Sequence, residues 1–269
     1  MRTFKPLPSC IVAIVVFGVA GVFASNTMAS SIYDIEQQSS GSAATLDSAP
    51  VITFIGSQPG TFGGHTYTSW SIFAQDSTGA IDLFGSLPGG TTEPTPTVGD
   101  AVNAAGTFSP FHQIPEIASM TSLTHVSTGN SVPTPMGYTV SQLTASGAFA
   151  LPQSIAGYVL RLQNVTLYTD SAATIPVSGN FAAANTALYA KDSNGDIMET
   201  YFWYTSYSAD GAMVGNPIPT GPVDIIGFVS QSGSFAPEIT PLAFVTVPEP
   251  STMVLIALAM LGLLGFRRR

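Results

Sequence analysis

The chain has 269 residues, of which 16 are acidic, seven are lysine or arginine and one is cysteine, with a formal net charge of −9 at pH 7. Between residues 30 and 247 the imbalance is larger, because 15 acidic residues stand against only Arg161 and Lys191, which makes the formal charge −13. Proteins bind nucleic acid mainly by neutralising phosphates with lysine and arginine, so this composition excludes nucleic acid as a partner.

The first 29 residues have the layout of a secretory signal peptide. Arg2 and Lys5 precede an apolar stretch at residues 11–23, and small and polar residues follow it. This order predicts export with cleavage between Ala29 and Ser30. Cleavage five residues earlier is an alternative, and so is an uncleaved anchor, although the apolar stretch is short for a membrane span. Cleavage removes the only cysteine, so we expect neither disulfide nor thiolate chemistry in the exported chain.

The middle of the chain divides into a leader and two copies of one module. Residues 30–49 are polar and rich in serine, which predicts a flexible leader. Residues 50–133 and 136–246 then share a pattern, because residues 72–81 match residues 188–197 at five of ten positions without a gap. Further matches follow in the same order, as for Gly106 with Gly227 and Glu116 with Glu238. Repeated matches in one order indicate a duplicated module.

Each copy has the pattern of a small β-barrel. Short apolar runs alternate with turns, and residues 76–79 and 192–195 offer the Asp and Gly that a tight hairpin turn needs. No segment shows a sustained helical period of apolar residues. Five strands, with a hairpin between the second and third and a longer excursion before the fourth, resemble the OB-fold. The expected fold class is therefore all-β, with two tandem OB-like barrels, and this resemblance indicates fold rather than activity.

Residues 247–269 hold the most specific motif in the sequence. Pro248, Glu249 and Pro250 precede an apolar run at residues 252–266, and three basic residues follow it: Arg267, Arg268 and Arg269. As a helix the run would span about 22 Å, which is short for a hydrocarbon core of about 30 Å. Snorkelling arginines and local thinning of the bilayer can cover that difference, and the arginines favour the cytoplasmic side.

Together the three parts of this tail resemble the PEP-CTERM sorting signal of Gram-negative bacteria. The resemblance implies that an exosortase-type enzyme recognises the tail and removes it near Pro-Glu-Pro. It further implies transient anchoring in the inner membrane, followed by release to the cell surface or the extracellular matrix, with extracellular polysaccharide as an implied partner. The alternative is an ordinary single-pass anchor, in which the tail stays in the membrane.

One predicted strand offers a candidate ligand platform. Side chains of a strand alternate between its two faces, so Tyr201, Trp203 and Tyr207 share one face. An aromatic platform on an acidic protein would suit a neutral polysaccharide. The alternative is that the other module or the long loops cover this face.

No catalytic, metal-binding or cofactor-binding residue is predicted. Residues 192–199 contain oxygen ligands spaced somewhat like those of a calcium loop but lack its twelve-residue pattern, so a plain turn is favoured. Three histidines lack metal-ligand spacing and are expected to face solvent: His65, His112 and His125. The sequence thus predicts a non-enzymatic surface or matrix protein with a structural or interaction role. The alternatives are a carbohydrate-binding module and an accessory protein related to secreted nucleases that contain OB-like modules.

Overall fold

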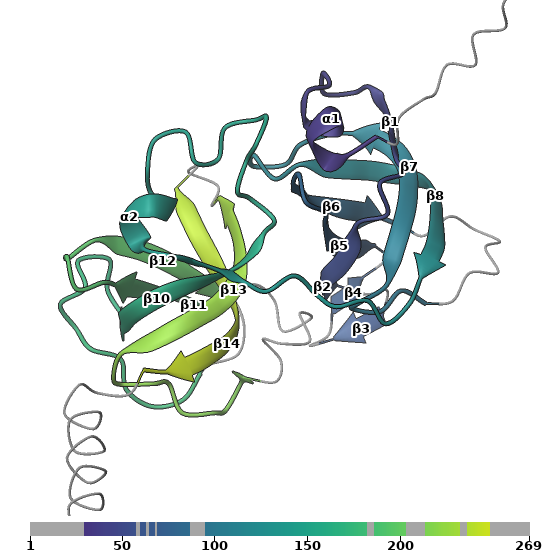
Figure 1. Cartoon of the computed structure of the whole chain (residues 1–269). Helices are drawn as coiled ribbons and strands as arrows, with labels where there is room; N and C mark the ends of the chain where they lie inside the picture. Colours follow the sequence, from purple (N-terminus) through teal and green to yellow (C-terminus); the bar gives the residue numbers. More distant parts are fainter. Residues whose placement is uncertain are drawn as a thin grey trace, which may run out of the picture.

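The computed structural model describes residues 30–57, 60–62, 65–67, 69–86, 95–181, 186–202, 213–231 and 236–247. These residues form two closed five-stranded barrels that lie side by side (Figure 1). The prediction of an all-β fold with two tandem small barrels is confirmed. Within the described ranges no helix is both long enough and apolar enough to cross a membrane. The predicted signal peptide and the apolar run of the tail lie outside these ranges.

Barrel 1 closes through five strands, and only one of its pairings is parallel. The strands are β2 (Val51–Ser57), β5 (Trp70–Gln75), β6 (Ala80–Gly85), β7 (Ala101–Phe108) and β8 (Glu116–Ser127). They pair in the order β2-β5-β6-β8-β7 and back to β2, with β6 and β8 parallel. A separate hairpin consists of β3 (Gly60–Phe62) and β4 (His65–Tyr67).

Barrel 2 repeats this order with its own five strands. They are β10 (Val159–Tyr168), β11 (Thr186–Lys191), β12 (Ile197–Phe202), β13 (Val223–Gln231) and β14 (Pro237–Thr246). The pairing order is β10-β11-β12-β14-β13 and back to β10, with β12 and β14 parallel. A short strand β9 (Met136–Tyr138) adds to β10, and helix α2 (Val140–Leu143) follows it. The order agrees with the OB-like pattern expected of each module, and assignment to the OB-fold itself stays a prediction.

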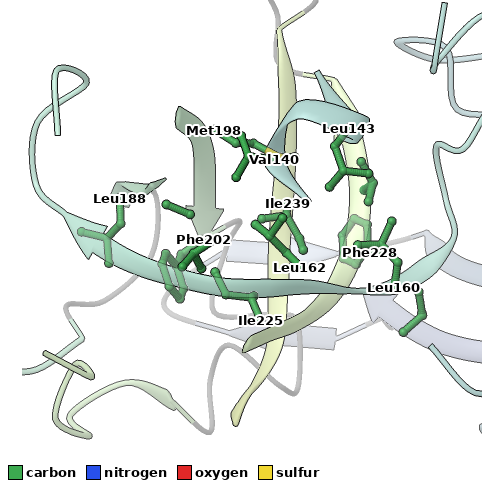
Figure 2. Close-up of a cluster of buried hydrophobic side chains, with 14 of the residues drawn as sticks. Val140, Leu143, Leu160, Leu162, Leu188, Met198, Phe202, Ile225, Phe228 and Ile239 are labelled. Atoms are coloured by element: carbon green, nitrogen blue, oxygen red, sulfur yellow. The ribbon is translucent and has the colours of Figure 1, made fainter. Parts of the chain in front are cut away.

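Each barrel has an apolar interior built by alternation along its strands. In barrel 2, Met198 and Phe202 of β12 are buried together with Leu162 of β10 and Ile239 of β14 (Figure 2). Val140 and Leu143 of α2 join the same cluster. Burying an aliphatic or aromatic side chain of this size contributes about 1.5–3 kcal/mol, so this cluster is the main source of the barrel's stability.

The segment predicted as a flexible leader is folded onto barrel 1, and that prediction is wrong. Helix α1 (Ile32–Glu36) begins with a capping box formed by Ser31 and Asp34, an arrangement that satisfies free amide groups at a helix start. Ile32 and Ile35 are fully buried in the barrel 1 core. Strand β1 (Ala43–Leu46) pairs with β7 and buries its last residue in that core. The composition of this segment is rich in serine and predicted disorder, but a few apolar residues occur in it at the spacing of a helix and of a strand.

The β5–β6 turn fastens this folded leader. One carboxylate oxygen of Asp76 accepts hydrogen bonds from the backbone amides of Thr78 and Gly79. The other accepts from the Ile32 amide at 3.1 Å and the Ser48 hydroxyl at 2.8 Å. Gly79 leaves room for α1, because a Cβ there would lie 2.4 Å from Cγ2 of Ile32. The predicted hairpin turn is therefore also an attachment point for the leader.

The second hairpin is one residue longer than the first. The β5–β6 turn leaves Gln75 opposite Ala80, whereas the β11–β12 turn leaves Lys191 opposite Ile197. The gap-free alignment of the two copies is therefore out of register by one residue beyond the turn. Each residue of β12 corresponds to the β6 residue one place earlier than that alignment indicates.

Candidate functional site between the barrels

The two barrels contact each other through a stack of three phenylalanine rings. Phe54 of β2 and Phe73 of β5 come from barrel 1, and Phe228 of β13 comes from barrel 2. The centroid of the Phe228 ring lies 4.6 Å from that of Phe73 and 5.2 Å from that of Phe54, with interplanar angles of 29° and 27°. All three rings are buried within one cluster that continues into the barrel 2 core. Offset stacking of this kind adds about 0.5–1.5 kcal/mol to area burial, so the joint resists separation of the barrels.

Hydrogen bonds from a loop of barrel 1 hold the edge of this joint. The Ser154 hydroxyl donates to the carbonyl oxygen of Gln113 at 3.0 Å. Nδ1 of His112 lies 3.0 Å from the carbonyl oxygen of Gln231 at the end of β13. Both His112 and Gln113 have left-handed backbone, with φ of 49° and 64°. Contacts with the other barrel hold this loop in an uncommon backbone conformation.

A third contact crosses the joint from the folded leader. The backbone amide of Gln153 donates to Oε2 of Glu36, while Oε1 of Glu36 is buried without a hydrogen-bond partner. Burial raises the pKa of Glu36 to about 7. The leader therefore stabilises the arrangement of both barrels, and not only barrel 1.

A cavity of about 500 Å³ opens between the barrels beside these contacts. Its size falls within the range of about 300–1,000 Å³ that small-molecule pockets occupy. Three parts of the chain line it: the β7–β8 loop, the loop after α2, and the facing ends of β13 and β14. The described lining residues are Gln113, Thr144, Ala145, Ser146, Gly147, Phe149, Ala150, Gln231 and Pro237, and none of them carries a charge. We call this space the inter-barrel cavity.

Two glutamines contribute hydrogen-bonding groups to the lining of the inter-barrel cavity. Gln113 and Gln231 enter the lining from different barrels, and Oε1 of Gln231 is buried without a hydrogen-bond partner. A buried amide oxygen without a partner is unfavourable by about 1–3 kcal/mol, and a rotation of the side chain that brings this oxygen to a ligand hydroxyl in the cavity would remove that penalty. The hydroxyl of Thr144 donates to the Val140 carbonyl at 3.0 Å, which leaves its oxygen able to accept.

A second unusual feature is a pair of buried carboxyl groups on barrel 1. Asp82 of β6 lies opposite Glu116 of β8 in the parallel pairing, and the two residues are 6% and 9% exposed. Ile81 and Leu83 belong to the barrel core, so Asp82 points away from the interior. Burial raises the pKa of Asp82 to about 7, and burial together with the Asp82 charge raises that of Glu116 to about 8. The Ser71 hydroxyl donates to Asp82 at 2.9 Å.

Barrel 2 carries an acidic pair at the same place. Glu199 of β12 lies opposite Glu238 of β14 in the equivalent parallel pairing. Glu238 is 2% exposed and accepts a hydrogen bond of 2.8 Å from the Ser230 hydroxyl. The one-residue difference between the hairpins hides the correspondence of Asp82 with Glu199 in the sequence. The repeated Pro-Glu-Ile at the start of β8 and β14 does show the correspondence of Glu116 with Glu238.

The aromatic platform is described only in part. Tyr201 of β12 is half-buried, whereas Phe202 is buried in the core, so the predicted alternation holds at these two positions. Trp203 and Tyr207 lie outside the described residues, and the platform stays a prediction. In barrel 1, Phe84 of β6 occupies the position equivalent to Tyr201, and it is 41% exposed.

Residues 192–199, whose oxygen ligands are spaced somewhat like those of a calcium loop, have the hydrogen bonds of an ordinary turn. Oδ1 of Asp192 accepts hydrogen bonds from the amides of Asn194 at 2.9 Å and Asp196 at 3.0 Å. No group of three or more potential metal ligands occurs among the residues that the structure describes.

Two of the three histidines do not face solvent, which corrects the prediction for them. Nε2 of His125 lies 3.2 Å from Oδ2 of Asp100, and both side chains are largely buried. His112 stacks on Phe111 with ring centroids 4.1 Å apart and contacts barrel 2 through the joint. The side chain of His65 lies outside what the structure describes. Each of these two histidines is held in place by a polar partner that lies far from it in the sequence.

The residues of the predicted sorting and cleavage sites lie almost entirely outside the described part. This applies to Ala29 and to the predicted sorting residues Pro248, Glu249, Pro250, Arg267, Arg268 and Arg269. Ser30 is described, and its carbonyl oxygen accepts a hydrogen bond from the Asp47 amide at 3.3 Å. The described residues therefore begin at the residue that follows the predicted cleavage point.

Comparison with known proteins gives one informative result at the C-terminal region. No curated protein matches the chain. Residues 246–269 match the PEP-CTERM protein-sorting motif, a stretch that includes all the predicted sorting residues. The motif implies transient membrane anchoring and exosortase-dependent sorting of an exported surface protein in Gram-negative bacteria. We therefore identify the chain as a carrier of the PEP-CTERM protein-sorting motif.

Proposed function

We propose that the chain is a non-enzymatic protein of the cell surface or extracellular matrix, with a structural or interaction role. The observation that carries this proposal is the sorting motif at residues 246–269. An exosortase-type enzyme cuts near Pro248, Glu249 and Pro250 and frees the two barrels from the inner membrane. The apolar run and the three arginines hold the chain in that membrane until the cut.

The surroundings of the acidic residues support a non-enzymatic role. A catalytic acid or base must come within hydrogen-bonding distance of its substrate. The carboxyl groups of Asp82 and Glu116, whose pKa is raised by burial, are each more than nine-tenths buried. A substrate outside the barrel does not reach them, so these groups support the fold rather than a reaction.

A triple variant tests the sorting step. Replacing Pro248, Glu249 and Pro250 with alanine should keep the chain in the inner membrane, because the apolar run remains while the recognised sequence is gone. A matched control, Val245→Ala, changes an exposed residue just before the matched stretch and should sort like the wild type. Membrane and extracellular fractions are compared by immunoblotting. Equal release of the triple variant and the wild type would contradict the proposal.

A further inference from the structure

The inter-barrel cavity has a lining that differs sharply from the rest of the molecule. Residues 30–247 carry a formal charge of −13, yet no described lining residue is charged. A site that binds an ionic ligand gains much of its affinity from a charged partner. The described lining residues offer none, so their chemistry favours a ligand without charge.

The lining combines polar groups with carbon surface in a way that suits a polyhydroxylated ligand. The lining residues Gln113 and Gln231 each carry a side-chain amide, which can donate and accept at the same time. Thr144 and Ser146 add hydroxyl groups at the rim, where both residues are exposed. Alanine side chains and Pro237 provide apolar contact for the C–H groups of a ring.

The Gln231 side chain has hydrogen-bonding capacity that no described protein group uses, and a rotation of this side chain would turn its amide into the cavity. Its Oε1 is buried without a hydrogen-bond partner, while its own backbone carbonyl is held by His112 at 3.0 Å. On the opposite side, the carbonyl of Gln113 is held by the Ser154 hydroxyl. The two amide-bearing residues are therefore fixed by their backbones before a ligand arrives. A fixed backbone leaves only side-chain torsions to be ordered on binding, which limits the loss of conformational entropy.

We propose that the inter-barrel cavity binds a neutral saccharide, with the amides of Gln113 and Gln231 hydrogen-bonded to its hydroxyl groups. The site is separate from the predicted platform at Tyr201. It is independent of the sorting route, because it belongs to the folded barrels. A neutral peptide fits less well, since the lining presents side-chain amides rather than a free strand edge along which a peptide backbone could pair.

Binding is tested with the full-length chain, solubilised in a detergent without a sugar headgroup. An array of neutral and charged glycans identifies the strongest neutral binder, and isothermal titration calorimetry then measures its affinity. Two variants change the cavity in different ways. Ala145→Trp fills it from an exposed rim position, and Gln231→Leu removes the unsatisfied amide while keeping side-chain size. The matched control Gln163→Leu removes an exposed amide from β10.

The proposal predicts saturable binding of at least one neutral glycan, weakened at least about tenfold in both cavity variants and unchanged in Gln163→Leu. Circular dichroism establishes that each variant is folded, and Ala145→Trp alone decides the question if Gln231→Leu does not fold. Failure of every neutral glycan to bind would overturn the proposal, as would equal affinity in the wild type and Ala145→Trp. Binding only to charged glycans or to neutral peptides would overturn it as well. Since binding is measured on purified protein, none of these results bears on sorting.

Discussion

Gly106 and Gly227 occupy equivalent strands of the two barrels at places where β7 meets β8 and β13 meets β14. A Cβ on Gly227 would lie 2.3 Å from the Thr240 carbonyl oxygen, and one on Gly106 would lie 2.7 Å from that of Ala118. Both glycines stand at irregularities of strand register. The sequence repeat showed that the glycines correspond, and the close approach of a neighbouring backbone explains why both positions hold glycine.

Gly227→Ala should therefore destabilise the protein by about 1–3 kcal/mol, because a well-packed interior resists even one added methyl group. Urea denaturation followed by circular dichroism measures this change in the free energy of unfolding. Gly221→Ala serves as the control, since a Cβ there meets nothing within 4 Å, and it should lie within about 0.5 kcal/mol of the wild type. Equal stability of the two variants would contradict the close-approach explanation.

The buried carboxyl groups predict an unusual dependence of stability on pH. Asp82, Glu116 and Glu36 have a raised pKa in the folded state, so between their unfolded and folded pKa values the folded state binds more protons. Stability then falls as pH rises from about 5 to 8, by about 1.4 kcal/mol per pH unit for each titrating group. Asp82→Asn and Glu116→Gln should flatten this slope in urea denaturation series.

Asp76 supplies the contrast for that measurement. Desolvation opposes its ionisation, but hydrogen bonds from Thr78, Ser48 and Ile32 outweigh that effect and lower its pKa. Its contribution is therefore present above the unfolded pKa and is lost as pH falls below about 4. Asp76→Asn should keep the part of the slope between pH 5 and 8 that comes from Asp82 and Glu116, and should reduce only the part from Glu36, whose pKa the Asp76 charge helps to raise. A wild-type protein whose stability rises steadily from pH 5 to 8 would show that the buried carboxyl groups do not titrate as described.

At the scale of elements, turn chemistry and apolar patterning predicted most of the strands but not the way in which the leader packs. The Asp and Gly of residues 76–79 and 192–195 predicted both hairpins, because few residue types can occupy such turns. The folded leader was missed because only a few apolar residues hold it, within a stretch whose composition is typical of disorder. The one-residue difference between the hairpins was also missed, since a gap-free alignment cannot represent it.

Ile35→Ala tests whether the folded leader is part of barrel 1. Ile35 is fully buried in the core of that barrel, so its truncation should destabilise the protein by about 2–5 kcal/mol. The same substitution at Ile175, which is 58% exposed, should change stability by no more than about 0.5 kcal/mol. Urea denaturation compares the two variants. If both behave like the wild type, the leader does not contribute to the core.

At the scale of the whole molecule, the joint makes the two barrels one unit. The rings of Phe54, Phe73 and Phe228 and the contact of Glu36 with Gln153 all cross it. Sequence could not predict this joint or the cavity beside it, because neither is encoded by a local pattern. Gln113 and Gln231, for example, are far apart in the chain and meet only once both barrels have formed.

A double-mutant cycle tests the joint. Phe73→Ala and Phe228→Ala should be coupled by about 0.5–1.5 kcal/mol, as measured from the free energies of unfolding of the single and double variants. The control cycle pairs Phe73→Ala with Phe181→Ala, whose ring contacts Phe202 and Phe244 instead, and should be additive to within about 0.5 kcal/mol. Additivity in both cycles would mean that the barrels do not support each other.

Sorting through the PEP-CTERM motif is the central claim, and intact-mass measurement of the protein from its native host tests it most directly. Extracellular and inner-membrane fractions are measured separately. Processing at both ends predicts an extracellular species that begins near Ser30 and ends between residues 247 and 250. A species that keeps Arg267, Arg268 and Arg269 and is found only in the inner membrane would contradict the account, because the tail would then be a permanent anchor.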